Sequence, residues 1–210
     1  MTNPSVPARV RPEAVQEHLD SWIVLHREGL KTGLRIIFGL IWAIDGALKF
    51  QPGLVGLFPQ MVANAGQNQP AWLGGWFAFW SAQASAQPAV WVYGTGALEL
   101  ALAFSLLFGF LRKVAYGGGF VLSLLIWAVP EGFGGPYGPG STDIGTGIVY
   151  ALVFVFLMAL NATYGPSRYS LDALIERRWP GWARVAEIRG PWSRSNAPGS
   201  AASTTGVDRA

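Results

Sequence analysis

The chain has 210 residues, enough for a single domain, with 51% hydrophobic residues, only 13% charged residues and a formal net charge of +3. Soluble domains carry about 25% charged residues, so this composition excludes a disordered or nucleic-acid-binding chain and argues against an ordinary soluble enzyme. Because there is no cysteine, disulfides, thiolate zinc sites and iron–sulfur clusters are excluded. With only two histidines, we predict no metal site.

Four long apolar runs predict four transmembrane helices. A helix that crosses a bilayer needs about 20 apolar residues, and flanking basic side chains can extend a slightly shorter run. The runs cover residues 33–50, 89–111, 114–129 and 144–162. We therefore expect an all-α protein, an integral membrane four-helix bundle built from residues 33–162.

The basic residues are distributed unevenly along the chain. Most precede or open the first run, occupy the turn at 112–113 or follow the fourth run, and the connections 51–88 and 130–143 contain none. Only Lys49 lies near these two connections. Under the positive-inside rule this predicts a multi-pass protein of a bacterial-type plasma (inner) membrane with both termini in the cytoplasm. No cleavable signal peptide is visible, so we expect the first run to be an uncleaved anchor.

Three polar segments flank the predicted bundle. Residues 1–32 form a cytoplasmic amphipathic segment in which Pro12–Lys31 is expected to be an interfacial helix. Residues 163–189 form a second cytoplasmic segment of the same character. Residues 190–210 are rich in Ser, Ala, Gly and Pro, which predicts a disordered tail.

The long outer connection contains a tryptophan-rich segment at 70–87. Trp72, Trp76 and Trp80 recur every four residues, which predicts a short helix with one aromatic face. Tryptophan favours the membrane–water interface, so the segment is either an aromatic belt or a roof over a ligand pocket. In the second interpretation Trp76 and Trp80 are candidate cofactor-binding residues.

Charged residues inside a span are functional candidates because their burial in lipid is unfavourable. Glu99 lies about 15 Å into the second run, near the bilayer centre, where an unpaired carboxylate should take up a proton. The functional interpretation is proton handling in an interior cavity, and the structural alternative is an interhelical hydrogen bond. Gly96, three residues earlier, is expected to make room beside this carboxyl group.

The first run contributes three further candidates. Asp45 precedes Lys49 by four residues, so the two share a helical face and are predicted to pair. Asp45 is a second proton-handling candidate, and Lys49 and Arg35 are candidate cofactor contacts. The structural alternatives are that the pair only fixes the depth of the helix and that Arg35 only anchors it.

The glycine-rich connection at 130–145 does not match a nucleotide-binding loop. Its spacing fits neither a P-loop nor GxGxxG, and it contains no lysine. Glu131 and Asp143 are instead candidates to face a shared outer vestibule. Several glycines, among them Gly96, Gly119 and Gly147, are expected to let helices approach closely.

The chain resembles the DoxX/DoxD-type membrane proteins over residues 33–162. The first run matches that family at Arg35, Gly39, Gly46 and Lys49, and the second matches it at Glu99, Gly109 and Arg112. Residues 130–150 resemble the DoxD branch, the small membrane subunit of thiosulfate:quinone oxidoreductase. The resemblance implies a four-helix membrane subunit or accessory protein of redox metabolism, with the lipid bilayer, a quinone and a redox partner subunit as its partners.

The residues themselves leave a second function open. A non-enzymatic membrane scaffold, or a protein that binds or carries a small apolar molecule, would also use intramembrane carboxylates and an outer cap. A transporter is less favoured because four helices in one copy are few and no inverted repeat is visible. The sequence does not decide whether the protein is an enzyme or whether it forms an oligomer.

Overall fold

The computed structural model describes residues 12–137, 143–165, 169–186 and 188. This part of the chain is all-helical and contains no strand, which confirms the predicted class. The predicted tail at 190–210 lies outside the described residues. The α-helices are α1 (Pro12–Leu48), α2 (Leu54–Ala65), α3 (Gly74–Ala86), α4 (Pro88–Phe108), α5 (Arg112–Ala128), α6 (Thr146–Tyr164), α7 (Leu171–Arg178) and α8 (Ala183–Ala186), with 3₁₀ turns at Ala71–Leu73, Gly132–Gly134 and Pro180–Trp182.

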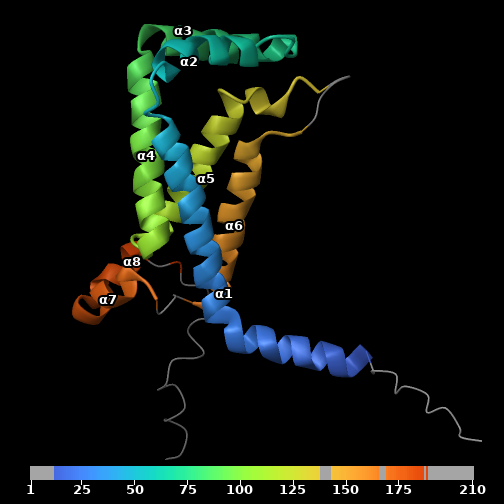
Figure 1. Ribbon diagram of the computed structural model, residues 1–210, viewed down its shortest axis with the longest axis vertical. Helices are drawn as coiled ribbons and strands as arrows, with labels where there is room; N and C mark the ends of the chain where they lie inside the picture. Colours follow the sequence, from blue (N-terminus) through green and yellow to red (C-terminus); the bar gives the residue numbers. More distant parts are fainter. Residues whose placement is uncertain (1–11, 138–142, 166–168, 187, 189–210) are drawn as a thin grey trace, which may run out of the picture.

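Four helices, α1, α4, α5 and α6, stand side by side and correspond to the four apolar runs (Figure 1). They pack mainly as two pairs, α1 with α4 and α5 with α6, whereas α4 touches α5 much less. α1 is one continuous helix from Pro12 to Leu48. It changes direction where it leaves the bundle, at the lower end in Figure 1. The predicted boundary at residue 32 therefore falls inside one helix and does not separate two helices.

The bundle buries one set of apolar side chains and exposes another. Its core centres on Phe38, Trp42, Leu106, Phe154 and Leu157. Large apolar side chains also point outward along all four helices, among them Ile37, Ile44, Leu98, Phe104, Val121, Leu152 and Phe156. By length and composition, α4 and α6 are apolar enough to cross a membrane, and only 33% and 28% of their apolar windows are buried.

Two helices, α2 and α3, lie across one end of the bundle as a roof (Figure 1). The Trp76 Nε1–H on α3 donates to the carbonyl oxygen of Ala128 at the end of α5 (3.0 Å). The Gln69 side chain, between the two roof helices, donates to the Gly132 carbonyl oxygen (2.8 Å). The tryptophan spacing correctly predicted α3, but α2 was not predicted, because Pro59 and a flanking glycine obscure its helical pattern.

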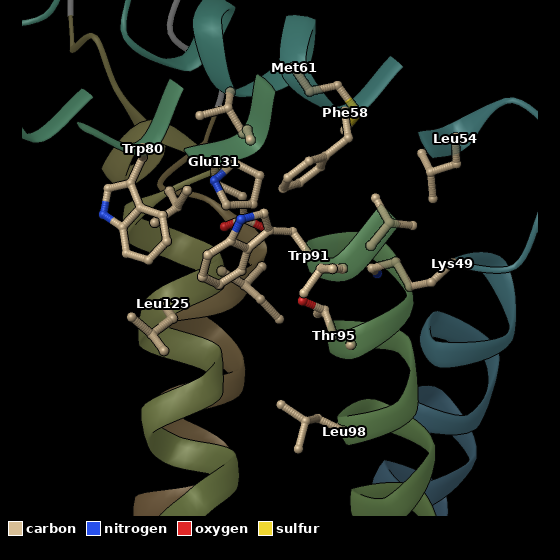
Figure 2. Close-up of a pocket in the computed structure, with 18 of the residues that line it drawn as sticks. Lys49, Leu54, Phe58, Met61, Trp80, Trp91, Thr95, Leu98, Leu125 and Glu131 are labelled. Atoms are coloured by element: carbon tan, nitrogen blue, oxygen red, sulfur yellow. The ribbon is translucent and has the colours of Figure 1, made fainter. Parts of the chain in front are cut away.

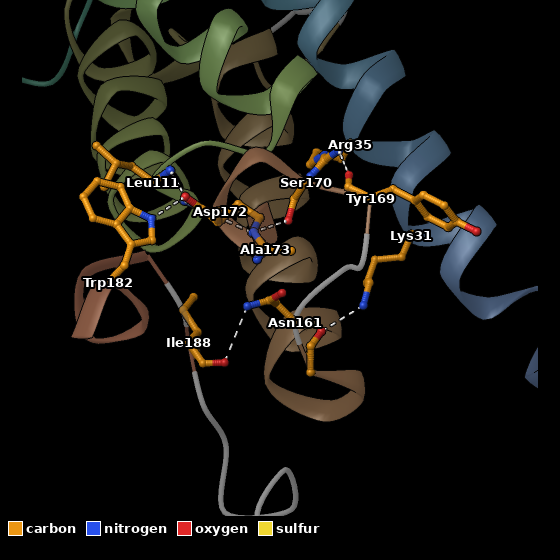
Figure 3. Close-up of polar contacts among 12 residues, drawn as sticks. Lys31, Arg35, Leu111, Asn161, Tyr169, Ser170, Asp172, Ala173, Trp182 and Ile188 are labelled. Atoms are coloured by element: carbon orange, nitrogen blue, oxygen red, sulfur yellow. Dashed lines mark hydrogen bonds and ion pairs between the residues drawn. The ribbon is translucent and has the colours of Figure 1, made fainter. Parts of the chain in front are cut away.

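At the opposite end of the bundle, the turn between α4 and α5 is closed by a residue from α7. The Asp172 carboxylate is fully buried and accepts hydrogen bonds from the backbone N–H groups of Leu111 (2.8 Å) and Arg112 (3.1 Å). It also accepts from the Arg112 Nε–H (3.2 Å) and the Trp182 Nε1–H (3.0 Å; Figure 3). Asp172 therefore caps the N-terminus of α5, and α7 is docked on the bundle through this buried carboxylate.

Helix α5 approaches α6 closely because Gly119 has no side chain. A Cβ atom at Gly119 would overlap the ring of Phe154, which is fully buried on α6. A Cβ atom at the neighbouring Gly118 would meet nothing within 4 Å. This contrast explains why a glycine is required at one of these adjacent positions and not at the other.

We predict that Gly119→Ala destabilises the folded protein by about 1 to 3 kcal/mol, because the added methyl group forces the Phe154 ring out of its packed position. Gly118→Ala is the matched control and should be neutral or stabilising by up to about 1 kcal/mol, because alanine favours a helix. Melting temperatures of the two variants in the same detergent provide the measurement. Equal melting temperatures would show that the close approach of α5 to α6 is not required.

Candidate functional site

Beneath the roof the structure contains a cavity of about 920 Å³, within the usual size range of small-molecule sites. It lies between α4 and α5, and the end of α1 and the roof helices complete its walls (Figure 2). Most of the lining is apolar. The polar and charged side chains in the lining are Lys49, Gln51, Thr95 and Glu131.

Aromatic rings line the part of the cavity next to the roof. Trp80 from α3 and Trp91 from α4 pack edge to face with ring centroids 5.3 Å apart, and Phe58 from α2 joins them. Leu98 and Leu125 lie farther from the roof, on α4 and α5 (Figure 2). The cavity therefore changes from an aromatic end to an aliphatic end along the bundle.

The two tryptophans predicted to contact a cofactor have different positions. Trp80 lines the cavity, as the roof interpretation of the outer segment required. Trp76 is not part of the lining; its ring packs 5.7 Å from that of Trp80, and its N–H is bonded to the Ala128 carbonyl. Trp76 therefore holds the roof in place and positions Trp80.

Lys49 forms the charged wall of the cavity and pairs with Glu99. Its Nζ lies 3.1 Å from Glu99 Oε2, although the angles are not those of a directed hydrogen bond. The Lys49 side chain is 30% exposed, whereas that of Glu99 is 1% exposed. The ion pair therefore joins a lysine that reaches the cavity to a carboxylate buried behind it.

The predicted ion pair between Asp45 and Lys49 is wrong. Lys49 Nζ reaches only the backbone carbonyl oxygen of Asp45, at 3.5 Å. The Asp45 carboxyl group interacts instead with the Tyr150 side chain on α6. Asp45 does not line the cavity, so the two carboxylates predicted to handle protons contact different partners.

Two glycines allow Lys49 to reach Glu99. A Cβ atom at Gly96 on α4 would lie 2.8 Å from the Lys49 Cβ, and one at Gly46 on α1 would lie 2.9 Å from a Leu100 side-chain carbon. The two helices can therefore approach closely beside the ion pair. Gly96 does make room next to Glu99, as expected from the sequence, and the lysine stem occupies that room.

Glu131 is a cavity residue that was named only as a vestibule candidate. Its Oε2 accepts a hydrogen bond from the backbone N–H of Gly147 in the first turn of α6 (2.9 Å). Asp143, its expected companion, accepts from the Gly145 N–H (2.8 Å) and does not line the cavity. No sequence pattern separates these two carboxylates, because the difference depends on the contact of Glu131 with Gly147 on α6.

Arg35, the remaining predicted cofactor contact, does not line the cavity. It is buried on α1 near the end of the bundle opposite the roof, where its Nη2 donates to the Tyr169 carbonyl oxygen (2.9 Å; Figure 3). Gly109 lies directly against its guanidinium group. The structure therefore supports the anchoring alternative for Arg35 and not a contact with a ligand in the cavity.

Among the described residues, no group of three or more His, Asp or Glu side chains is arranged to hold a metal ion. The candidate site is the cavity with Lys49, Thr95, Glu131 and the contacting tryptophans Trp80 and Trp91.

Comparison of the chain with protein-family models, with curated proteins and with solved structures finds no match.

We predict that Lys49 and Glu99 are energetically coupled. Lys49→Met alone leaves Glu99 buried without its cation and should destabilise the protein by about 1 to 3 kcal/mol, toward the lower end because Lys49 is partly exposed. The Lys49→Met, Glu99→Leu double variant should recover part of this loss. As the control cycle, Lys49→Met with Asp45→Asn should be nearly additive. The melting temperatures of the single and double variants provide the measurement. If the losses of stability of the Lys49 and Glu99 single variants simply add up in the double variant, the two side chains are not paired.

Proposed function

We propose that this chain is a DoxX/DoxD-like integral membrane protein that binds a quinone in its cavity and acts as a membrane subunit or accessory protein of redox metabolism. The observation that carries the proposal is the apolar cavity of about 920 Å³, with aromatic rings near the roof and a paired lysine in its wall. A site of this kind suits a flat, neutral, lipid-soluble ring.

Several observations support placing the bundle in a membrane. Large apolar side chains cover its outward faces, which a water-soluble monomer rarely exposes over so wide an area. Lysine and arginine are absent from the connections at 51–88 and 130–143 and flank the other ends of the helices. We therefore propose that α1, α4, α5 and α6 cross a bacterial inner membrane, with the roof outside and α7 on the cytoplasmic side.

The polar groups of the cavity suit a ligand with carbonyl oxygens. The charge of Lys49 is balanced by Glu99, so this wall favours a neutral molecule over an anion. An ammonium group carries three donors, and those not directed at Glu99 can reach a ligand carbonyl. The Thr95 hydroxyl lies in the same wall and offers a second donor (Figure 2).

In a redox role, reduction of a quinone takes up two electrons and two protons. We propose that a partner subunit supplies the electrons and that the Lys49–Glu99 pair takes part in proton transfer. Lys49 can donate one of the two protons to a ligand oxygen, and water entering at the roof supplies the second proton and returns Lys49 to its ammonium form. The Glu99 carboxylate, in contact with Lys49, favours that return because it attracts the positive charge. Asp45 has no direct part in this step because its carboxyl group neither lines the cavity nor pairs with Lys49.

The burial of Glu99 favours a second candidate function. Its side chain is enclosed behind Lys49, so its role can be to hold α1 against α4 without any proton transfer. In that case the protein is a non-enzymatic carrier or scaffold that binds a small apolar molecule. The quinone content of protein purified in a mild detergent separates the two functions: bound quinone favours the redox role, and protein without it favours the carrier or scaffold.

The orientation is tested by single-cysteine labelling, because the chain has no cysteine of its own. Ser85→Cys on the roof should react in intact inner membranes with an impermeant maleimide added from the outside. Arg178→Cys at the end of α7 should react only after that membrane is permeabilised. Both residues are exposed, so burial does not prevent labelling of either one. The reverse pattern would overturn the orientation.

Quinone binding is tested by titrating the purified protein with a short-tailed ubiquinone and following tryptophan fluorescence, because Trp80 and Trp91 line the cavity. We expect saturable quenching with the wild type. Lys49→Met should weaken binding about tenfold, which is the loss expected for one hydrogen bond from a charged donor. Lys113→Met removes an exposed lysine outside the cavity and should leave binding unchanged. Equal affinities for all three proteins would contradict the proposed site.

A further inference from the structure

The roof and the parts of the four long helices nearest to it, taken together, carry more negative than positive charge, because the arginines at 35 and 112 and the lysine at 113 lie at the opposite end of the bundle. From residue 36 to 111 and from 114 to 165 the sequence contains four acidic residues, Asp45, Glu99, Glu131 and Asp143, and a single basic residue, Lys49. The formal net charge of these stretches is −3. Any ligand that enters the cavity therefore meets a field that favours cations.

Glu131 brings this charge to the cavity wall. Its carboxylate is fixed by the hydrogen bond from the Gly147 N–H, and it lies on the α5 side, across the cavity from Lys49 (Figure 2). Lys49 is the one cation among the lining residues, and its charge is already matched by Glu99 at 3.1 Å. The wall around Glu131 is therefore acidic and has no neighbouring cation in the lining.

Aromatic rings line the same end of the cavity. Trp80 and Trp91 meet edge to face at 5.3 Å, and Phe58 completes the aromatic lining below the roof. The face of an aromatic ring attracts a cation, most strongly when water is excluded. A carboxylate near two tryptophan rings suits a cation with few or no hydrogen-bond donors (Figure 2).

We propose that the cavity binds lipophilic organic cations, that is, molecules with a quaternary or charge-delocalised centre on an apolar body. The cationic centre lies near Glu131 and the rings of Trp80 and Trp91. The apolar body extends toward the aliphatic end, against Leu98 and Leu125. This binding activity is independent of the quinone proposal, because it uses the Glu131 end of the cavity and requires no carbonyl oxygen on the ligand.

The test compares two probes of matched size and shape but opposite charge, tetraphenylphosphonium and tetraphenylborate, binding to the purified full-length protein in detergent. We expect saturable binding of the cation and at least about tenfold weaker binding of the anion, measured by equilibrium dialysis and corrected for binding to empty micelles. Equal affinity for the two ions would overturn the proposal, because the cavity would then be selecting size and apolarity alone.

Substitutions locate the site. Glu131→Gln keeps an oxygen that can accept from the Gly147 N–H but removes the charge, so cation binding should weaken about tenfold while the melting temperature changes little. Asp143→Asn removes a carboxylate of the same outer connection that does not line the cavity and should have no effect. Unchanged cation binding in Glu131→Gln would overturn the assignment.

A second substitution keeps the test valid if Glu131→Gln does not fold. Trp91→Leu replaces an aromatic wall by an aliphatic one and should weaken tetraphenylphosphonium binding several-fold, with no such loss for tetraphenylborate. Equal losses for both ions would show that Trp91 provides apolar contact only and would overturn the aromatic part of the site. Because these probes have no carbonyl group, failure of quinone binding would leave the result unaffected.

Discussion

The ion pair between Lys49 and Glu99 holds the charged wall of the cavity together. It joins α1 to α4 at the point where the two helices reach the cavity, and it accounts for a carboxylate that is almost completely buried. Gly46 and Gly96 remove the side chains that would otherwise separate the helices. If the pair were absent, the buried charge of Glu99 would be uncompensated, and the cavity would lose the lysine in its wall.

The cavity itself follows from how the four long helices are grouped. α1 packs on α4 and α5 packs on α6, whereas α4 and α5 touch little, so space remains between the two pairs next to the roof. Polar contacts hold both ends of this arrangement. Trp76 and Gln69 attach the roof to the end of α5, and Asp172 closes the turn between α4 and α5 at the other end.

The cavity has one wall with Lys49 and an opposite wall with Glu131, and these two walls differ in charge. Each of the two proposed ligands suits one of them. The side with Lys49 is neutralised by Glu99 and offers donors, which suits a carbonyl oxygen. The side with Glu131 is acidic and lies next to aromatic rings, which suits a cationic centre. The aliphatic part of the cavity contributes apolar contact to either ligand and does not discriminate between them.

Features that depend on local pattern and length could be predicted from the amino-acid sequence. The four apolar runs predicted the long helices α1, α4, α5 and α6, and the spacing of the tryptophans at 72, 76 and 80 predicted the roof helix α3. Which charged side chains meet could not be predicted in this way, because it depends on how the helices pack. Lys49 and Asp45 share a helical face, yet Lys49 pairs with Glu99, because a glycine on the neighbouring helix opens a contact that no spacing within one helix encodes. The capping role of Asp172 and the place of Glu131 in the cavity were decided in the same way, since each depends on residues distant in sequence that meet only when the helices pack.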